Sequence, residues 1–176
     1  MSVNKKKSIS DFSSLTADIP LEIKTPQDIL SEEDYNLVKD IFDTTVKYKS
    51  NNWYCEVPFS EIQNDCIKLQ SLLVTCAFKL GTLLGYAEGI DDQLKISRSK
   101  IRLKARDLKT DYQNQGDAVS ITIDDIKDLS YTNTEVIWSK LHQAKIAADF
   151  VKFVYFAAKD QVTMLDHALH RLSRLE

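Results

Sequence analysis

The chain has 176 residues, 43% hydrophobic and 28% charged, which suits one folded domain or a small core with an arm. Four Gly and three Pro argue against a turn-rich β protein, and three cysteines without a CxxC spacing argue against a disulfide framework or a zinc site. The formal net charge of −3 excludes a uniformly basic nucleic-acid binder, and the amino terminus lacks the apolar segment of a secretory signal.

The first 59 residues are expected to contain little regular structure. Residues 1–30, rich in Ser, Lys and Asp at first and then interrupted by two prolines, are predicted to be a flexible amino-terminal arm. Acidic residues at 32–34 indicate the start of a short helix that runs to about Lys47. Residues 31–59 are therefore predicted to form a short helix followed by a loop.

The strongest pattern in the chain begins at Ser60, where Ser60 and Gln63 have the spacing of a capping box. Apolar residues behind it recur at alternating steps of four and three, which is a heptad pattern. A helix of about 50 residues would be about 75 Å long. Such a helix requires a partner helix or a second copy of the chain to cover it. The pattern consists of Ile62, Cys66, Leu69, Leu73, Cys76, Leu80, Leu83, Ala87, Ile90, Leu94, Ile101 and Leu108.

Three glycines, Gly81, Gly85 and Gly89, lie four residues apart in this helix. They are compatible with close approach of another helix, or with a bend or break, because each Gly costs about 1 kcal/mol relative to Ala. We favour close packing. The most apolar stretch, residues 69–87, contains Lys79, and a charge at that position makes a membrane span costly, so no membrane association is expected.

The remainder of the chain is predicted to contain a short extended segment near residues 119–123, one helical turn at 124–129 and a long last helix capped by Asn133 or Thr134. The last helix has two apolar stripes, and both must be covered. The predicted fold class is mainly α, with residues 60–176 forming a long helical hairpin. The main stripe consists of Ile137, Leu141, Ala144, Ala148, Val151, Tyr155, Ala158, Val162, Leu165, Leu169 and Leu172.

Positive charge is concentrated in residues 95–109, here called the basic segment. Seven cations against one acid give it a net charge of +6, so the rest of the chain carries −9. On a helix the cations border the apolar pattern on both sides. Like charges at this spacing destabilise a helix, which favours a function in binding phosphates of a polyanion. A solvated face, or ion pairs with acids of a neighbouring helix, is the alternative. The cations are Lys95, Arg98, Lys100, Arg102, Lys104, Arg106 and Lys109.

The other candidate features are interpreted as structural. Neither His167 nor His170 has a carboxylate or Cys at ligand spacing, so no metal site is predicted, and no catalytic or cofactor motif is present in the sequence. The chain is therefore not expected to be an enzyme. Trp53 and Trp138 are interpreted as core anchors rather than as base-stacking platforms. A lysine stripe on the last helix is interpreted as a solvated face, or as an extension of the basic surface if the two helices pair; it consists of Lys145, Lys152 and Lys159.

Residues 101–117, IRLKARDLKTDYQNQGD, resemble the core of the UvsY-type recombination mediators of tailed phages. Those proteins carry an L-K-A-R stretch at the end of a long first helix, which residues 103–106 reproduce. A turn with an aromatic residue and a glycine follows, where Tyr112 and Gly116 stand here. A long carboxy-terminal helix then begins near an aromatic residue, at the place of Trp138 in this chain.

The resemblance implies a small, ring-forming helical homo-oligomer that binds single-stranded DNA without catalysis. It also implies two protein partners, because the family helps to load a strand-exchange recombinase onto DNA covered by single-strand binding protein. The family's basic pair corresponds to Lys104 and Arg106, and the location would be cytoplasmic, in the host cell if the chain is phage-encoded. The alternative is a non-enzymatic structural or adaptor protein that uses the basic segment for contacts with other proteins.

Overall fold

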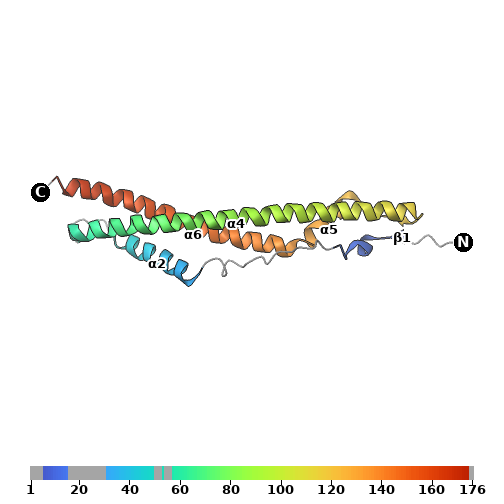
Figure 1. Cartoon of the computed structure of the whole chain (residues 1–176), viewed down its shortest axis with the longest axis horizontal. Helices are drawn as coiled ribbons and strands as arrows, with labels where there is room; N and C mark the ends of the chain where they lie inside the picture. The colour runs from blue at the N-terminus through green and yellow to red at the C-terminus, as the bar shows by residue number, and fades with distance from the viewer. Residues whose placement is uncertain (1–5, 16–30, 50–52, 54–56, 175–176) are drawn as a thin grey trace. The chain divides into compact units, whose positions relative to one another are not determined.

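The structure, a computed structural model, describes residues 6–15, 31–49, 53 and 57–174 (Figure 1). The chain is mainly α-helical with one very long helix and a long carboxy-terminal helix, which confirms the predicted fold class. The elements in chain order are β1 (Lys6–Lys7), the 3₁₀ helix η1 (Ile9–Phe12), α2 (Glu32–Val46), α4 (Phe59–Asn114), β2 (Ala118–Val119), α5 (Ile123–Thr132) and α6 (Glu135–Leu172).

The chain divides into two compact units, and α4 and α6 each contribute to both. Unit 1 contains residues 1–23 and 87–142, and unit 2 contains residues 24–86 and 143–176. The predicted organisation treats residues 60–176 as one hairpin, and the division into units passes through both of its long helices. Unit 2 also contains α2, whereas unit 1 also contains α5 and the amino-terminal strand.

Unit 2 is built on α2, the first part of α4 and the later part of α6. The heptad pattern of α4 forms its core, together with the main apolar stripe of α6, as the periodicity predicts. α2 runs antiparallel to α4, since Tyr48 beyond its end contacts Asp65 whereas Asp34 near its start contacts Lys79. The residues that are at most 1% exposed include Ile41, Ile62, Leu69, Leu83 and Leu165.

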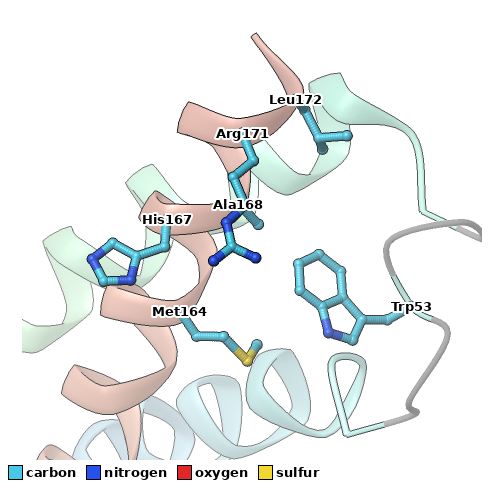
Figure 2. Close-up of a pocket in the computed structure, with 6 residues that line it drawn as sticks. All are labelled: Trp53, Met164, His167, Ala168, Arg171 and Leu172. Carbon is cyan, nitrogen blue, oxygen red and sulfur yellow. The ribbon is translucent and has the colours of Figure 1, made fainter. Parts of the chain in front are cut away.

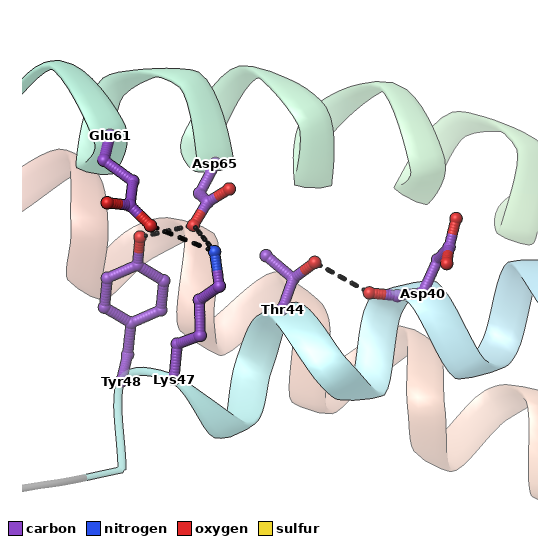
Figure 3. A network of polar contacts seen from close by, with 6 residues as sticks. All are labelled: Asp40, Thr44, Lys47, Tyr48, Glu61 and Asp65. Carbon is purple, nitrogen blue, oxygen red and sulfur yellow. Dashed lines mark hydrogen bonds and ion pairs between the residues drawn. The ribbon is translucent and has the colours of Figure 1, made fainter.

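A polar network joins the end of α2 to the start of α4 (Figure 3). Lys47 Nζ donates to Glu61 Oε1 at 3.2 Å and to Asp65 Oδ2 at 3.1 Å, and the Tyr48 hydroxyl donates to the same Asp65 oxygen at 2.7 Å. Burial, together with this hydrogen bond to a carboxylate, raises the pKa of Tyr48. Tyr48 therefore stays protonated, and its apolar ring packs edge-on against Trp53 at 5.1 Å between centroids.

Unit 1 shows that part of the predicted flexible arm is structured. Residues 6–7 form β1, which pairs in parallel with β2 in the register Lys6 to Ala118, and Phe12 is fully buried. Phe12 packs edge-on against Tyr112 at 5.8 Å, in a small core with Ala105 and Ile126. Residues 6–15 of the predicted flexible arm thus have regular structure, held by the pairing of β1 with β2 and by the burial of Phe12. Residues 16–30 lie outside the described residues.

The extended segment predicted at residues 119–123 is shorter than expected. Only Ala118–Val119 forms a strand, and Ile123 already opens α5. The extended segment ends at Thr122 because this residue caps α5. The Thr122 side chain accepts a hydrogen bond from the Asp125 backbone N–H, and the Asp125 side chain accepts one from the Thr122 backbone N–H, which is a capping box. The predicted single turn is accordingly a helix of 10 residues.

The long helix α4 is continuous through its three glycines. Gly81, Gly85 and Gly89 are exposed, and an added Cβ at any of them would meet nothing within 4 Å. The expectation of close helix packing at these glycines is thus wrong within the described chain. The buried face of α4 lies on the opposite side of the helix, where Leu83 and Ala87 are 1% and 5% exposed.

Unit 2 also carries large apolar side chains on surfaces that the described chain leaves exposed. On α4 these are Ile67, Val74 and Phe78, here called the α4 outward face, and Phe78 is 75% exposed. By length and composition alone, α4 includes a segment apolar enough to cross a membrane, and most of that segment is exposed. This apolar composition arises because α4 has two apolar faces, one buried in the core of unit 2 and the other exposed as the α4 outward face. The α6 outward face consists of Ile146, Phe150, Phe153 and Phe156.

Candidate nucleic-acid interface

Three of the seven candidate cations, Lys100, Lys104 and Arg106, are exposed on the part of α4 that belongs to unit 1. Within the described parts of the chain, none of their three charged side-chain groups has a hydrogen bond or ion pair to another residue; the side-chain bond to Arg106, from the Thr110 hydroxyl, goes to its backbone oxygen. At 100° per residue Lys100 and Lys104 lie on one side of the exposed Leu103, and Arg106 lies on the other. These three side chains are available to a ligand without breaking a contact.

Arg98 and Arg102 are partly buried and are held by α5 and by Thr134, the residue before α6. Arg98 Nε donates to the Thr134 hydroxyl at 3.1 Å, and Arg102 Nε donates to the Ser130 hydroxyl at 3.0 Å. Both guanidinium groups lie over the Tyr131 ring, at 4.3 and 5.6 Å from its centroid. The two arginines therefore have fixed positions, and their terminal nitrogens make no further hydrogen bond within the described residues.

Lys95 and Lys109, at the two ends of the basic segment, have partners within the chain. Lys109 Nζ donates to the Ile121 backbone oxygen at 2.7 Å, which ties α4 to the segment before α5. Lys95 Nζ lies 2.6 Å from Asp91 and 3.3 Å from Asp92, and hydrogen bonds to these two carboxylates raise its pKa. Lys95 is thus ion-paired, but with acids of its own helix and not with the acids of a neighbouring helix that the alternative interpretation predicts.

Two aromatic side chains lie beside the arginines and remain half exposed, Tyr131 at 49% and Trp138 at 50%. The Trp138 ring stacks on His142, with an interplanar angle of 3° and 5.5 Å between centroids. The interpretation of Trp138 as a core anchor is therefore wrong, whereas Trp53 is buried as expected. The position of Trp138 directly after Ile137, off the buried stripe of α6, is the sequence signal for this exposure.

A surface hollow of about 420 Å³ brings these groups together. Its lining combines a guanidinium, two aromatic rings, a hydroxyl and a carboxylate, all from unit 1. Aromatic faces beside charged and hydroxyl groups suit a flat molecule that also carries polar groups. The lining residues are Arg98, Tyr131, Thr132, Glu135 and Trp138.

A second hollow of about 470 Å³ lies in unit 2 and has a different chemistry (Figure 2). Figure 2 shows the Trp53 indole and the Met164 side chain on its apolar side, with Arg171 and His167 projecting from α6. In the described ranges, no group of three or more His, Cys, Asp or Glu side chains lies close enough to hold a metal ion. This hollow contains none of the cations of the basic segment.

Comparisons of the chain with protein-family models, with curated proteins and with solved structures found no match.

Proposed function

We propose that the protein is a non-enzymatic, homo-oligomeric protein that binds single-stranded DNA and acts as a recombination mediator. The observation that carries the proposal is the grouping, on unit 1, of three exposed and unpaired cations with two arginines stacked on an aromatic ring. Lys100, Lys104 and Arg106 contact backbone phosphates, and Arg98 and Arg102 supply guanidinium groups that are already oriented.

The binding is electrostatic and largely independent of sequence. Lys and Arg side chains displace counterions from the phosphates, so affinity falls as salt rises. Because the exposed cations lie on one helix, they follow an extended backbone rather than enclosing a small anion. Proteins that bind single strands without sequence preference combine such a charged surface with aromatic side chains.

The mediator role adds two partners, a strand-exchange recombinase and the single-strand binding protein that covers the DNA. It is supported by the resemblance of residues 103–106 to the recombination mediators and by the order of a long helix, a turn and a second long helix, here with β2 and α5 between the turn and α6. The proposed location is the cytoplasm, and no cofactor takes part.

Self-association supplies avidity for a long strand. The support for a homo-oligomer is the exposed apolar surface of unit 2, in which Phe78 is 75% and Phe153 is 74% exposed. Aromatic side chains that bury 150–250 Å² each on contact are rarely left in water in such numbers on a monomer. A second copy of the chain that covers the α4 and α6 outward faces removes this surface from water.

The experiment that tests DNA binding compares two triple variants of the full chain by fluorescence anisotropy of a labelled thymidine oligonucleotide. Lys100→Ser with Lys104→Ser and Arg106→Ser is expected to weaken binding on the order of 100-fold at about 50 mM salt, because three phosphate contacts are lost. The matched control replaces the exposed lysines of the α6 stripe, Lys145, Lys152 and Lys159, by Ser and is expected to bind within a few-fold of wild type.

The alternative is a structural or adaptor protein, and one observation favours it. The exposed apolar faces of unit 2 suit protein contacts, and the end of the basic segment at Lys95 is neutralised by Asp91 and Asp92. This alternative predicts that the chain self-associates in light scattering but binds no oligonucleotide at low salt. If the oligonucleotide binds to the chain and the mass measured by light scattering increases on binding, the result supports the mediator instead.

A further inference from the structure

The hollow beside Tyr131 and Trp138 offers two aromatic rings at one place on the surface of unit 1. Each ring is about half exposed, and both line the same hollow. One neighbour of Trp138, the His142 ring, lies parallel to it and limits its rotation, so the indole is held in one orientation. Tyr131 is held by the two guanidinium groups that lie over it. Rings that are fixed before binding lose little conformational freedom when a ligand stacks on them.

The charges around the hollow are arranged for a ligand with an anionic part and a polar, uncharged part. Arg98 lines the hollow, and its Nε is already engaged by Thr134, which leaves the terminal nitrogens for a phosphate. Glu135 also lines the hollow, and a carboxylate repels a phosphate but accepts hydrogen bonds from the N–H groups of a base, such as the ring N–H of thymine. A phosphate is therefore favoured at the arginine side of the hollow and a base at the glutamate side.

We propose that this hollow is a base-stacking site, in which an unpaired nucleobase of a single strand stacks on Trp138 or Tyr131 while its neighbouring phosphate contacts Arg98. The proposal rests on the single-strand binding proposed above and specifies how a single strand is distinguished from a duplex. In a duplex the bases stack on one another and their faces are inaccessible. An exposed aromatic platform therefore adds affinity only for unpaired bases.

Trp138 allows the site to be observed directly, because the chain has only two tryptophans and the other one, Trp53, is buried in unit 2. In the full-length Trp53→Phe variant, indole emission reports on Trp138 alone. Titration with a thymidine oligonucleotide is expected to quench this emission as binding proceeds. Inorganic polyphosphate, which carries the same charge without bases, is expected to bind without quenching. If Trp53→Phe does not fold, the emission change of Trp138→Phe is subtracted from that of the wild-type chain, and the difference reports on Trp138.

The affinity of ring variants provides a second readout. Trp138→Leu is expected to weaken oligonucleotide binding roughly 5- to 150-fold, the range for loss of one stacked base. Trp138→Phe retains a ring and is expected to recover most of the affinity. The matched control is Val136→Ala, which changes another exposed side chain near the start of α6 that does not line the hollow. This control is expected to bind like the wild type.

Four outcomes separate the proposal from the function on which it rests. Absence of any oligonucleotide binding rejects both. Salt-dependent binding that leaves Trp138 emission and the affinity of Trp138→Leu unchanged rejects the stacking site alone. Equal quenching by polyphosphate also rejects stacking, since charge then explains the signal. If thymidine monophosphate binds as tightly as the oligonucleotide, the hollow is a site for a free nucleotide. That result overturns its assignment to a single strand.

Discussion

Lys79 Nζ lies 2.9 Å from Asp34 Oδ1, so that a charge in the middle of the most apolar stretch of α4 is paired with the first turn of α2. Asp34 is itself buried and closes the cap of α2, accepting a hydrogen bond from the Ser31 backbone N–H at 2.9 Å. One carboxylate thus both begins α2 and joins it to α4. The pair explains why Lys79 is tolerated among apolar neighbours.

The first prediction concerns the pH dependence of this pair. Burial opposes ionisation of Asp34, but the Lys79 ammonium and the Ser31 hydrogen bonds outweigh burial and lower the pKa below its ordinary 3.8. A carboxyl whose pKa is lowered by folding stabilises the native state above its unfolded pKa, and this contribution disappears as the pH falls through the lower folded value. Asp34→Asn is therefore expected to lose about 1–3 kcal/mol near neutral pH and a smaller amount near pH 2. Urea unfolding at both pH values measures this difference.

The control for that measurement is Asp43→Asn, which alters an exposed carboxylate on the same helix. It is expected to change the unfolding free energy by less than about 0.5 kcal/mol. If Asp34→Asn lowers the unfolding free energy equally at both pH values, the hydrogen bonds of the helix cap stabilise the fold and the charge of Asp34 does not.

The second prediction uses two adjacent leucines on α4. Leu83 is 1% exposed within the core of unit 2, whereas Leu84 is 45% exposed. Leu83→Ala is expected to cost about 2–5 kcal/mol because it leaves a cavity, and Leu84→Ala less than about 1 kcal/mol. Thermal or urea unfolding compares the two. Equal losses of stability in the two variants would contradict the orientation of α4 about its axis, which buries Leu83 and exposes Leu84.

The third prediction concerns self-association. Phe78→Ser with Phe153→Ser is expected to lower the mass measured by light scattering at a given concentration, because each substitution removes an exposed ring from an outward face of unit 2. Phe42→Ser, on α2, is a control that removes another exposed ring, 57% exposed, lying outside both outward faces. A wild-type chain that stays monomeric at high concentration contradicts the assignment of these faces to a second copy.

The heptad pattern predicted the long helices and their buried faces well, because burial against one neighbouring helix leaves a strong signal at steps of three and four. Ile62, Leu69 and Leu83 are all buried as that pattern requires. Contacts between distant segments leave no such periodic signal. Phe12 lies in a mainly polar arm without a periodic apolar pattern, and its packing against Tyr112 and the pairing of β1 with β2 are what show that residues 6–15 are structured.

The sequence singles out the basic segment as the candidate site but does not show the surroundings of its individual cations. Charge density identified residues 95–109, yet the sequence did not distinguish the cations that hold α5 from those that remain available. Arg98 and Lys104 have the same charge, but Arg98 is tied to Thr134, and this difference depends on the packing of α5 and the start of α6. The exposure of Trp138 likewise follows from where α6 begins, since that start places Ile137 rather than Trp138 in the core.

The most direct test of the central claim is the salt dependence of oligonucleotide binding by the wild-type chain and by Lys104→Ala with Arg106→Ala. Each phosphate contact to a single strand contributes about 0.7 to the slope of log Kobs against log salt. The account predicts measurable binding by the wild type, weaker binding by the double variant, and a slope that is shallower by about 1.4. An unchanged slope in the double variant, or no binding by the wild type at low salt, would contradict the claim that these side chains bind DNA.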